Sequence, residues 1–272
     1  MINNNDHWNS QATKWASIGP PLRPSSEDIS VFNDMLNKCS EKSSLTKSLL
    51  LGVTSEIATI DYFDKNHLIA IDRNISMINQ LSAIESNNAK LMIQGDWLTM
   101  PFENGSLNIV IGDGCFTQLH YPNDYKNVLK NISRLLKKNG FVIFRFFTKN
   151  NLESEEHIIN EIKTNKIKNF HIFKFRLAMA LQLDVEKGVK LSDIWNTWES
   201  LKINTNILAA SLNCDIETIQ SIDSYKNSKA RYSFPSEIEL TEVLCENFTL
   251  IEHYQPEYPF GDQCPIMLLQ KK

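Results

Sequence analysis

The chain has 272 residues, of which 42% are hydrophobic and 10% aromatic, so it carries enough apolar side chains for a packed core. At about 150 residues per domain, this length predicts one large domain, or one domain with a sizeable elaboration. The formal net charge of −4 argues against a general nucleic-acid binder, which would need a basic face for phosphates.

Two further features of the composition bear on where the protein works. No apolar run approaches the roughly 18 residues of a membrane span, and the start of the chain lacks the apolar stretch of a secretory signal. The five cysteines are scattered, without a CxxC motif or a Cys/His cluster. We therefore expect a cytoplasmic protein with free thiols, no metal site and no membrane partner.

The first 47 residues combine a polar stretch with one predicted helix. Prolines at positions 20, 21 and 24 exclude a helix there. Ser25 or Ser26, followed by two acidic residues, then predicts a helix start, because acidic side chains favour the positive end of the helix dipole. We interpret residues 1–47 as a leader and helix that cover a ligand site.

From residue 48 to 147, short apolar runs alternate with amphipathic segments. Helical spacing is clearest after residue 123, and that helix is predicted to end at Asn139-Gly140, a left-handed cap. The apolar runs predict five strands, at 48–51, 68–71, 91–93, 107–111 and 141–144. Strands alternating with helices in this way predict a doubly wound, Rossmann-like α/β fold with a parallel sheet.

The rest of the chain changes character twice. Residues 150–235 are poor in strand signals and predict a helical insertion of four or five helices. After it, Ser236-Glu-Ile-Glu239 is typical of a capping box at a helix start. Two apolar runs at 248–253 and 265–269 then predict an antiparallel hairpin at the sheet edge. The predicted core therefore comprises residues 48–149 and 236–272.

The carboxyl ends of the predicted strands carry the residues that can bind a ligand. Gly52 ends the first strand and allows a tight turn, and Asp72 ends the second strand 20 residues later. An acid at that place can accept hydrogen bonds from a ribose diol. The alternative is that Asp72 only caps the helix that begins near Asn74.

The next two strand ends are also followed by acids. Asp96, between Gly95 and Trp97, can accept a hydrogen bond from an adenine amino group, with the indole as a wall. The alternative is a simple turn followed by core packing. Asp113 lies between two glycines after the fourth strand, where an open backbone leaves room for a reacting group.

In this order, the motifs resemble class I S-adenosylmethionine-dependent methyltransferases. The resemblance is carried by Leu50-Leu-Gly-Val-Thr-Ser-Glu56, Ala70-Ile-Asp-Arg-Asn-Ile-Ser-Met77, Gly95-Asp-Trp-Leu-Thr-Met-Pro-Phe102 and Asp113-Gly-Cys-Phe116. It implies a seven-stranded, mostly parallel sheet whose last strand is antiparallel. It also implies S-adenosylmethionine as cofactor and S-adenosylhomocysteine as product.

The resemblance implies a set of cofactor-binding residues. Asp72 would hold the ribose hydroxyls, Asp96 and Trp97 would face the adenine, and Asp113 would border the sulfonium. The full set is Trp15, Arg23, Gly52, Val53, Thr54, Glu56, Asp72, Arg73, Met77, Gly95, Asp96, Trp97, Asp113, Gly114 and Cys115. The family's GxGxG pattern is not kept, because Thr54 and Glu56 replace the later glycines. Our hypothesis is that Glu56 or the Thr54 hydroxyl binds the cofactor's ammonium group.

Methyl transfer needs positioning more than a fixed catalytic group, because the sulfonium is already electrophilic. With Asp113 as the other catalytic candidate, His120 is the candidate base, the alternative being an ordinary loop histidine. Arg145 is a candidate for binding a substrate carboxylate, the alternative being an ion pair with a core or loop acid. Phe116 and Tyr121 are the other candidate substrate contacts.

These features favour a methyltransferase that acts on a small-molecule acceptor by in-line displacement. A protein methyltransferase, or a non-catalytic cofactor-binding or partner subunit of the same fold, stays open. A nicotinamide-dependent oxidoreductase is disfavoured by the missing glycines, and a nucleic-acid substrate by the absence of a basic stripe. The sequence leaves the oligomeric state open.

Overall fold

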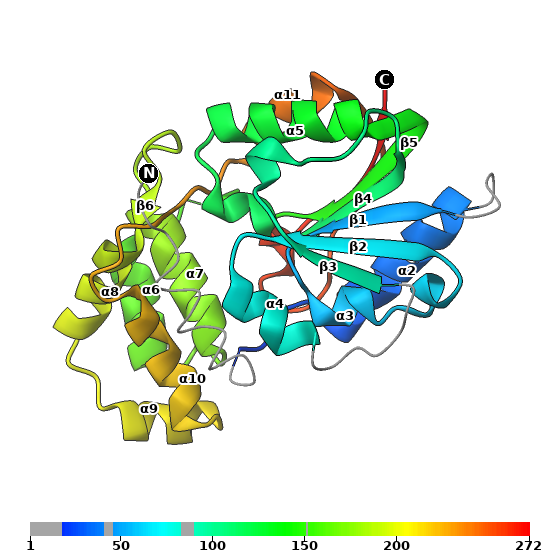
Figure 1. Cartoon of the computed structure of the whole chain (residues 1–272). Coiled ribbons are helices and arrows are strands. Elements are labelled where there is room, and N and C mark those ends of the chain that lie inside the picture. The colour runs from blue at the N-terminus through cyan, green and yellow to red at the C-terminus, as the bar shows by residue number, and fades with distance from the viewer. Residues whose placement is uncertain (1–17, 41–45, 83–89, 151) are drawn as a thin grey trace.

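The computed structural model describes residues 18–40, 46–82, 90–150 and 152–272. Within these residues, seven strands form one sheet in the order β3-β2-β1-β4-β5-β9-β8 (Figure 1). Their bounds are β1 Lys47–Leu51, β2 His67–Asp72, β3 Lys90–Gln94, β4 Leu107–Asp113, β5 Leu136–Arg145, β8 Phe248–Tyr254 and β9 Ile266–Lys271. The first five strands are parallel and β9 runs antiparallel to β5 and β8, so the predicted sheet is confirmed.

The central strands are buried because their sequences are almost continuously apolar. Leu51 of β1 lies opposite Ile71 of β2 on one side and Gly112 of β4 on the other. The residues that follow these three positions therefore meet at one edge of the sheet. This register is what gathers Gly52, Asp72 and Asp113 at the same edge.

Helices cover both faces of the sheet (Figure 1). The helices α5 (Asn123–Leu135) and α11 (Glu237–Cys245) pack their apolar sides on one face. The other face is covered by α2 (Ser26–Ser40), α3 (Ser55–Ala58) and α4 (Ile75–Ser82). Burial of apolar surface on both faces of the sheet is the main driving force for this layered arrangement.

The predicted end of the helix before β5 was wrong. The helix α5 ends at Leu135, and Leu136 already pairs with Leu107 of β4. The next paired residues are Ile109 and Phe141, so the exposed residues between them loop out of the ladder. Asn139 does have a left-handed φ of 61°, but it lies in this irregular part of the strand rather than in a helix cap.

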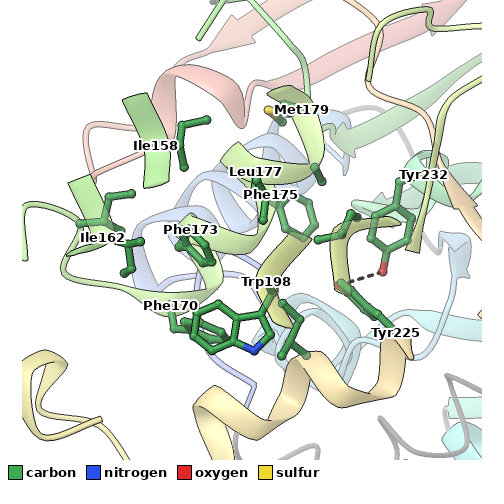
Figure 2. Close-up of a cluster of buried hydrophobic side chains, with 14 of the residues drawn as sticks. Ile158, Ile162, Phe170, Phe173, Phe175, Leu177, Met179, Trp198, Tyr225 and Tyr232 are labelled. Carbon is green, nitrogen blue, oxygen red and sulfur yellow. Dashed lines mark hydrogen bonds between the residues drawn. The ribbon is translucent and has the colours of Figure 1, made fainter. Parts of the chain in front are cut away.

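The insertion after β5 has its own hydrophobic core (Figure 2). Its helices are α6 Glu155–Lys163, α7 Phe170–Leu181, α8 Leu191–Ser200, α9 Thr205–Leu212 and α10 Ile216–Gln220. The central helix α7 is apolar on almost every side, as expected of a helix surrounded by others. Phe170 and Phe173 contact Trp198 of α8 edge to face. The short strands β6 (Val189–Lys190) and β7 (Arg231–Tyr232) form an antiparallel pair that the sequence did not indicate.

Candidate active site

The turn after β1 brings the ends of two strands and an indole ring together. Gly52 has a φ of +91°, which favours glycine, and its N–H donates to the Ile71 carbonyl at 2.9 Å. A Cβ built at this position would lie 3.9 Å from Asp72 Oδ2 and 4.0 Å from the Trp97 ring. The Trp97 Nε1 also donates to the Ile71 carbonyl, at 2.9 Å. Gly52, Asp72 and Trp97 therefore lie together at the edge of the sheet, and we refer to this group of three residues as the recess.

Asp72 does not provide the side-chain cap of the helix that follows it. Its Oδ1 accepts the Asn74 N–H at 2.7 Å, while Asn74 Oδ1 itself accepts the Met77 N–H of α4 at 2.9 Å. Asn74, not Asp72, thus provides the side-chain cap of α4. Burial raises the pKa of the Asp72 carboxyl to about 6, against the opposing effect of its backbone hydrogen bonds.

Asp96 has two protein partners. Its Oδ1 accepts the Leu98 N–H at 2.9 Å and so caps a short turn at Trp97–Thr99. Its Oδ2 lies 2.5 Å from Arg73 Nη2, in a pair that is half exposed. Each carboxylate oxygen offers two acceptor positions, so these two bonds leave capacity for two further donors. The neighbouring Gly95 lets the chain pass close to Ile71, because a Cβ at this position would lie 2.7 Å from the Ile71 side chain.

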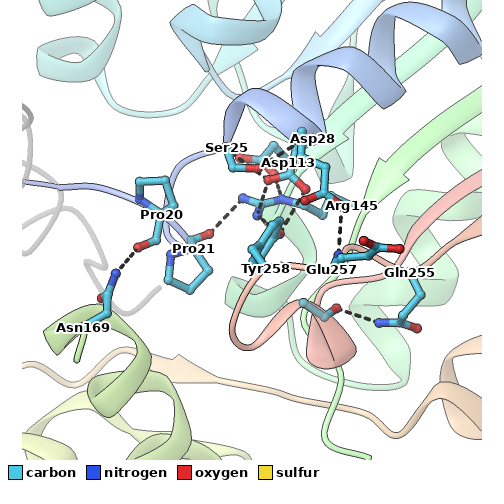
Figure 3. Close-up of polar contacts among 12 residues, drawn as sticks. Pro20, Pro21, Ser25, Asp28, Asp113, Arg145, Asn169, Gln255, Glu257 and Tyr258 are labelled. Carbon is cyan, nitrogen blue, oxygen red and sulfur yellow. Dashed lines mark hydrogen bonds and ion pairs between the residues drawn. The ribbon is translucent and has the colours of Figure 1, made fainter. Parts of the chain in front are cut away.

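The end of β4 is joined to a buried ionic network (Figure 3). Arg145 Nε lies 2.5 Å from Asp113 Oδ1, and Arg145 Nη1 lies 3.2 Å from Asp28 Oδ2. Its Nη2 donates to the Pro21 carbonyl at 2.9 Å, and its Nη1 to the Tyr258 hydroxyl at 3.1 Å. Burial raises the pKa of Asp113, while the guanidinium opposes this shift.

This network corrects our expectation for Arg145. The side chain is only 1% exposed, and its three nitrogens bond to protein groups. It forms the ion pair with internal acids that the sequence offered as the alternative, and it does not present a nitrogen to a substrate carboxylate. A buried arginine is tolerated because two carboxylates and two further oxygens surround it.

The leader is fixed to both the first motif and the insertion. Arg23 Nε lies 2.5 Å from Glu56 Oε1 at the start of α3. On the other side, the Gly19 N–H donates to His171 Nε2 at 3.1 Å, and Asn169 Nδ2 donates to the Pro20 carbonyl at 2.9 Å. Sequence reasoning missed His171 and Asn169, since no local pattern marks a contact with a segment about 150 positions away. Trp15 lies outside the described residues.

Several other candidates lie away from this recess. Phe116 is 2% exposed and packs against Tyr125, with ring centroids 4.9 Å apart. The Tyr121 hydroxyl donates to the Glu239 carbonyl of α11 at 3.1 Å. Both aromatic side chains therefore belong to the core under α5 and α11, which corrects their assignment as substrate contacts. His120 is exposed and lines a cavity of about 540 Å³ together with residues of the insertion such as Arg231.

The remaining candidates have structural environments of different kinds. Val53 and Met77 are buried in the core on the α2 side of the sheet. Cys115 is also buried, and burial raises the pKa of its thiol, so it is not a thiolate. Thr54 is half-buried and precedes α3 without a side-chain cap bond. Gly114 has a left-handed φ of 58°, which turns the chain sharply after β4.

One group of possible metal ligands occurs among the described residues, away from the strand ends. It consists of Glu153, His157 and Glu161 around α6. Arg176 of α7 forms ion pairs with both glutamates, so their charge is already compensated by the protein. Within the same residues, no helix has the length and apolar character to cross a bilayer.

Comparisons with known proteins agree on a fold and a domain. Residues 50–144 match a family model described as "Methyltransferase domain". No curated protein matches the chain in sequence. Among solved structures, an N-methyltransferase NodS from Bradyrhizobium japonicum in complex with S-adenosylhomocysteine is 11% identical. It covers 98% of this chain and 99% of its own, with a TM-score of 0.55.

Two further structures show how widely the fold is shared. A protein from Rhodobacter sphaeroides titled a putative Zn-dependent alcohol dehydrogenase is 12% identical, with a TM-score of 0.61 over 97% of this chain and 98% of its own. A putative methyltransferase of Haloferax volcanii, in complex with the activator Trm112, is 13% identical, with a TM-score of 0.51 over 98% and 94%. At these identities the similarity concerns the fold alone.

The strand order distinguishes this sheet from that of dinucleotide-binding dehydrogenases. A dinucleotide-binding dehydrogenase sheet has the order 3-2-1-4-5-6. Here an antiparallel β9 is inserted between β5 and β8. The strand order is that of the class I methyltransferase fold, in agreement with the methyltransferase domain matched at residues 50–144. The chain therefore carries a methyltransferase domain, and S-adenosylmethionine is the cofactor that a domain of this class uses.

Proposed function

We propose that the acceptor of the methyl group is a small molecule. The observation that carries this proposal is the bridge formed by residues 19–23 between the first motif and the insertion. Because contacts join segments from three parts of the chain beside the sheet edge, a compact acceptor fits better there than a folded macromolecule. The net charge of −4 also disfavours a polyanionic substrate.

The residues of the recess divide the binding of the cofactor among them. Asp72 would accept the two ribose hydroxyls, and Asp96 would accept the adenine amino group, with Trp97 beside the ring. Asp113 borders the reacting group, and Arg145 and Asp28 fix its position. S-adenosylmethionine supplies an electrophilic methyl group when bound, so the chain contributes orientation and exclusion of water.

We also propose that Glu56 binds the ammonium group of the cofactor's methionine part. Glu56 lies directly after the Gly52 turn, and Arg23 orients its carboxylate by the ion pair at 2.5 Å. Glu56→Gln is expected to weaken S-adenosylhomocysteine binding about tenfold, since a charge-assisted hydrogen bond contributes about 1.5–3 kcal/mol. Calorimetric titration measures this, with Glu103→Gln, an exposed glutamate remote from the recess, as control. An unchanged affinity would refute the assignment.

The class of acceptor is tested by following a labelled methyl group. The protein is incubated with S-adenosylmethionine labelled in the methyl group and a cell extract divided by ultrafiltration into small molecules and macromolecules. We expect label in product only with the small-molecule fraction, and about tenfold less with Asp72→Asn at limiting cofactor. Incorporation into the protein fraction alone would contradict the proposal.

A further inference from the structure

The buried network at the end of β4 contains one more acid than base (Figure 3). Asp28 and Asp113 share the single guanidinium of Arg145, and the three side chains are at most 4% exposed. Asp28 also accepts hydrogen bonds from the Ser25 N–H at 2.7 Å and the Tyr258 hydroxyl at 2.9 Å, but both donors are neutral. Among the described residues, no second ion pair reaches either acid. With both acids ionised, the network carries one net negative charge, which is unfavourable in the interior unless a ligand offsets it.

The other charged groups at this edge of the sheet do not remove the surplus. The pairs Arg23–Glu56 and Arg73–Asp96 are each neutral. Asp72 forms no ion pair with a described residue, and burial raises its pKa to about 6, so the carboxyl is mostly ionised at pH 7. Together with the network, these groups carry two net negative charges. S-adenosylmethionine has a sulfonium, an ammonium and a carboxylate, and its net charge of about +1 at neutral pH is complementary to this edge.

Asp113 lies between the residues proposed to hold the two ends of the cofactor. Burial raises the pKa of Asp113, and the charges of Asp28 and Glu56 add to this shift, so Glu56 lies within electrostatic range. Burial also raises the pKa of the Cys115 thiol, with further contributions from Asp113 and Asp72, so both carboxylates lie near Cys115. The sulfur of S-adenosylmethionine joins its amino-acid part to its ribose. With Glu56 at the ammonium group and Asp72 at the ribose, the sulfur lies beside Asp113.

We propose that Asp113 selects for positive charge at the sulfur position, so that the cationic cofactor binds more tightly than its neutral product. The inference rests on the proposed function, namely on the placement of the cofactor between Glu56 and Asp72. A sulfonium is attracted by the net negative charge of the network, whereas the sulfide of S-adenosylhomocysteine is not. Because these groups are shielded from water, the attraction is screened less than at the surface. Transfer of the methyl group removes the attraction and so weakens binding of the product.

The test compares three ligands that differ at one position, each titrated by calorimetry into the full-length protein. S-adenosylmethionine carries the sulfonium there, sinefungin carries a carbon with an ammonium group, and S-adenosylhomocysteine is neutral. We expect both cationic ligands to bind at least tenfold more tightly than S-adenosylhomocysteine. Agreement between the two separates the effect of charge from that of a hydrogen bond, because a sulfonium has no N–H to donate.

Two variants assign the preference to one carboxylate. Asp113→Asn should remove most of it, mainly by weakening the two cationic ligands. Asp96→Asn is the matched control and should weaken all three ligands about equally, because the adenine is common to them. The wild-type comparison needs no variant, so it decides the proposal even where Asp113→Asn does not fold in a thermal unfolding control.

The outcomes separate this proposal from the proposed function. Equal wild-type affinity for the three ligands, tighter binding of S-adenosylhomocysteine, or a preference that persists in folded Asp113→Asn would each overturn the role of Asp113 and leave the cofactor assignment intact. Binding of none of the three ligands would overturn both together.

Discussion

Burial disfavours the ionised form of the Asp72 carboxyl, and hydrogen bonds from a bound cofactor would offset this effect. Its carboxyl lies at the end of β2 with a pKa raised to about 6, and one oxygen already bonds to the Asn74 N–H. Ribose hydroxyls donate to the ionised carboxylate and would compensate for lost hydration. The charge of Asp72, the proposed ribose ligand, should therefore change with pH just below neutrality.

We expect the affinity for S-adenosylhomocysteine to rise as the pH increases through about 6 and then to level off. With that pKa, about a tenth of the carboxyl is ionised one pH unit lower, so binding at pH 5 should be about tenfold weaker than at pH 7. Asp72→Asn should bind about tenfold more weakly at pH 7 and lose most of this dependence. Calorimetry at several pH values measures both, with Asp64→Asn as control. A parallel slope in Asp72→Asn would contradict this role.

Among individual residues, those that directly follow strand ends could be predicted from the sequence. Residues that contact one another from distant parts of the chain could not. Gly52, Asp72 and Asp96 could be found because parallel strands place their carboxyl ends at one edge. The partners of Arg145 could not, since Asp28 is 117 positions away. Phe116 and Tyr121 were misassigned because proximity in sequence to Asp113 says nothing about the face to which a side chain turns.

Among the elements, α7 contains a lysine where a core residue is expected. Lys174 is 1% exposed, and its Nζ donates to Ser221 Oγ at 2.8 Å. The ammonium lies over the rings of Phe170 and Tyr225, and no ion pair joins it to an acid among the described residues. Burial lowers its pKa from 10.5 to about 7. The helix thus buries a group whose charged form is strongly disfavoured.

We expect Lys174→Met to raise the free energy of unfolding by about 2–4 kcal/mol at pH 7. The unfolded chain binds more protons than the folded one between about pH 7 and 10.5, so wild-type stability should rise with pH over that window. The advantage of the variant should therefore shrink toward pH 10. Chemical denaturation at both pH values measures this, with Lys163→Met on the surface of α6 as control. A difference that is constant with pH would argue against a buried neutral lysine.

The elements also show what periodicity can and cannot indicate. The strand and helix alternation of the core was predictable because the apolar runs of the central strands β1 and β4 are buried on both faces. The pair β6 and β7 was not, since two residues in each strand carry no period. The end of α5 was misplaced because Asn139-Gly140 suits a helix cap as well as the loop within β5 that it actually forms.

For the molecule as a whole, local signals fixed the layers but not how the insertion is seated. The alternation of strands and helices predicted the parallel sheet, and the last two apolar runs predicted the antiparallel hairpin at its edge. The position of the insertion rests on contacts such as that between Ser233 N–H and the Thr117 carbonyl at 2.9 Å. The hydroxyl of Tyr125 adds a bond to the Ser233 carbonyl at 3.3 Å. Such pairings join residues more than 100 positions apart and leave no trace in local composition.

The short segment 19–23 has a kinetic consequence. It is tied to Glu56 on one side and to α7 on the other. With the cofactor beside Glu56, as we propose, these few bonds hold the segment next to it, and we expect their opening to contribute to the rate of product release. Substitutions that weaken these bonds should speed product release and also lower the affinity for S-adenosylmethionine. The rate of product release and the affinity for the cofactor can therefore change through these bonds alone, without a change in the residues proposed to hold the nucleoside.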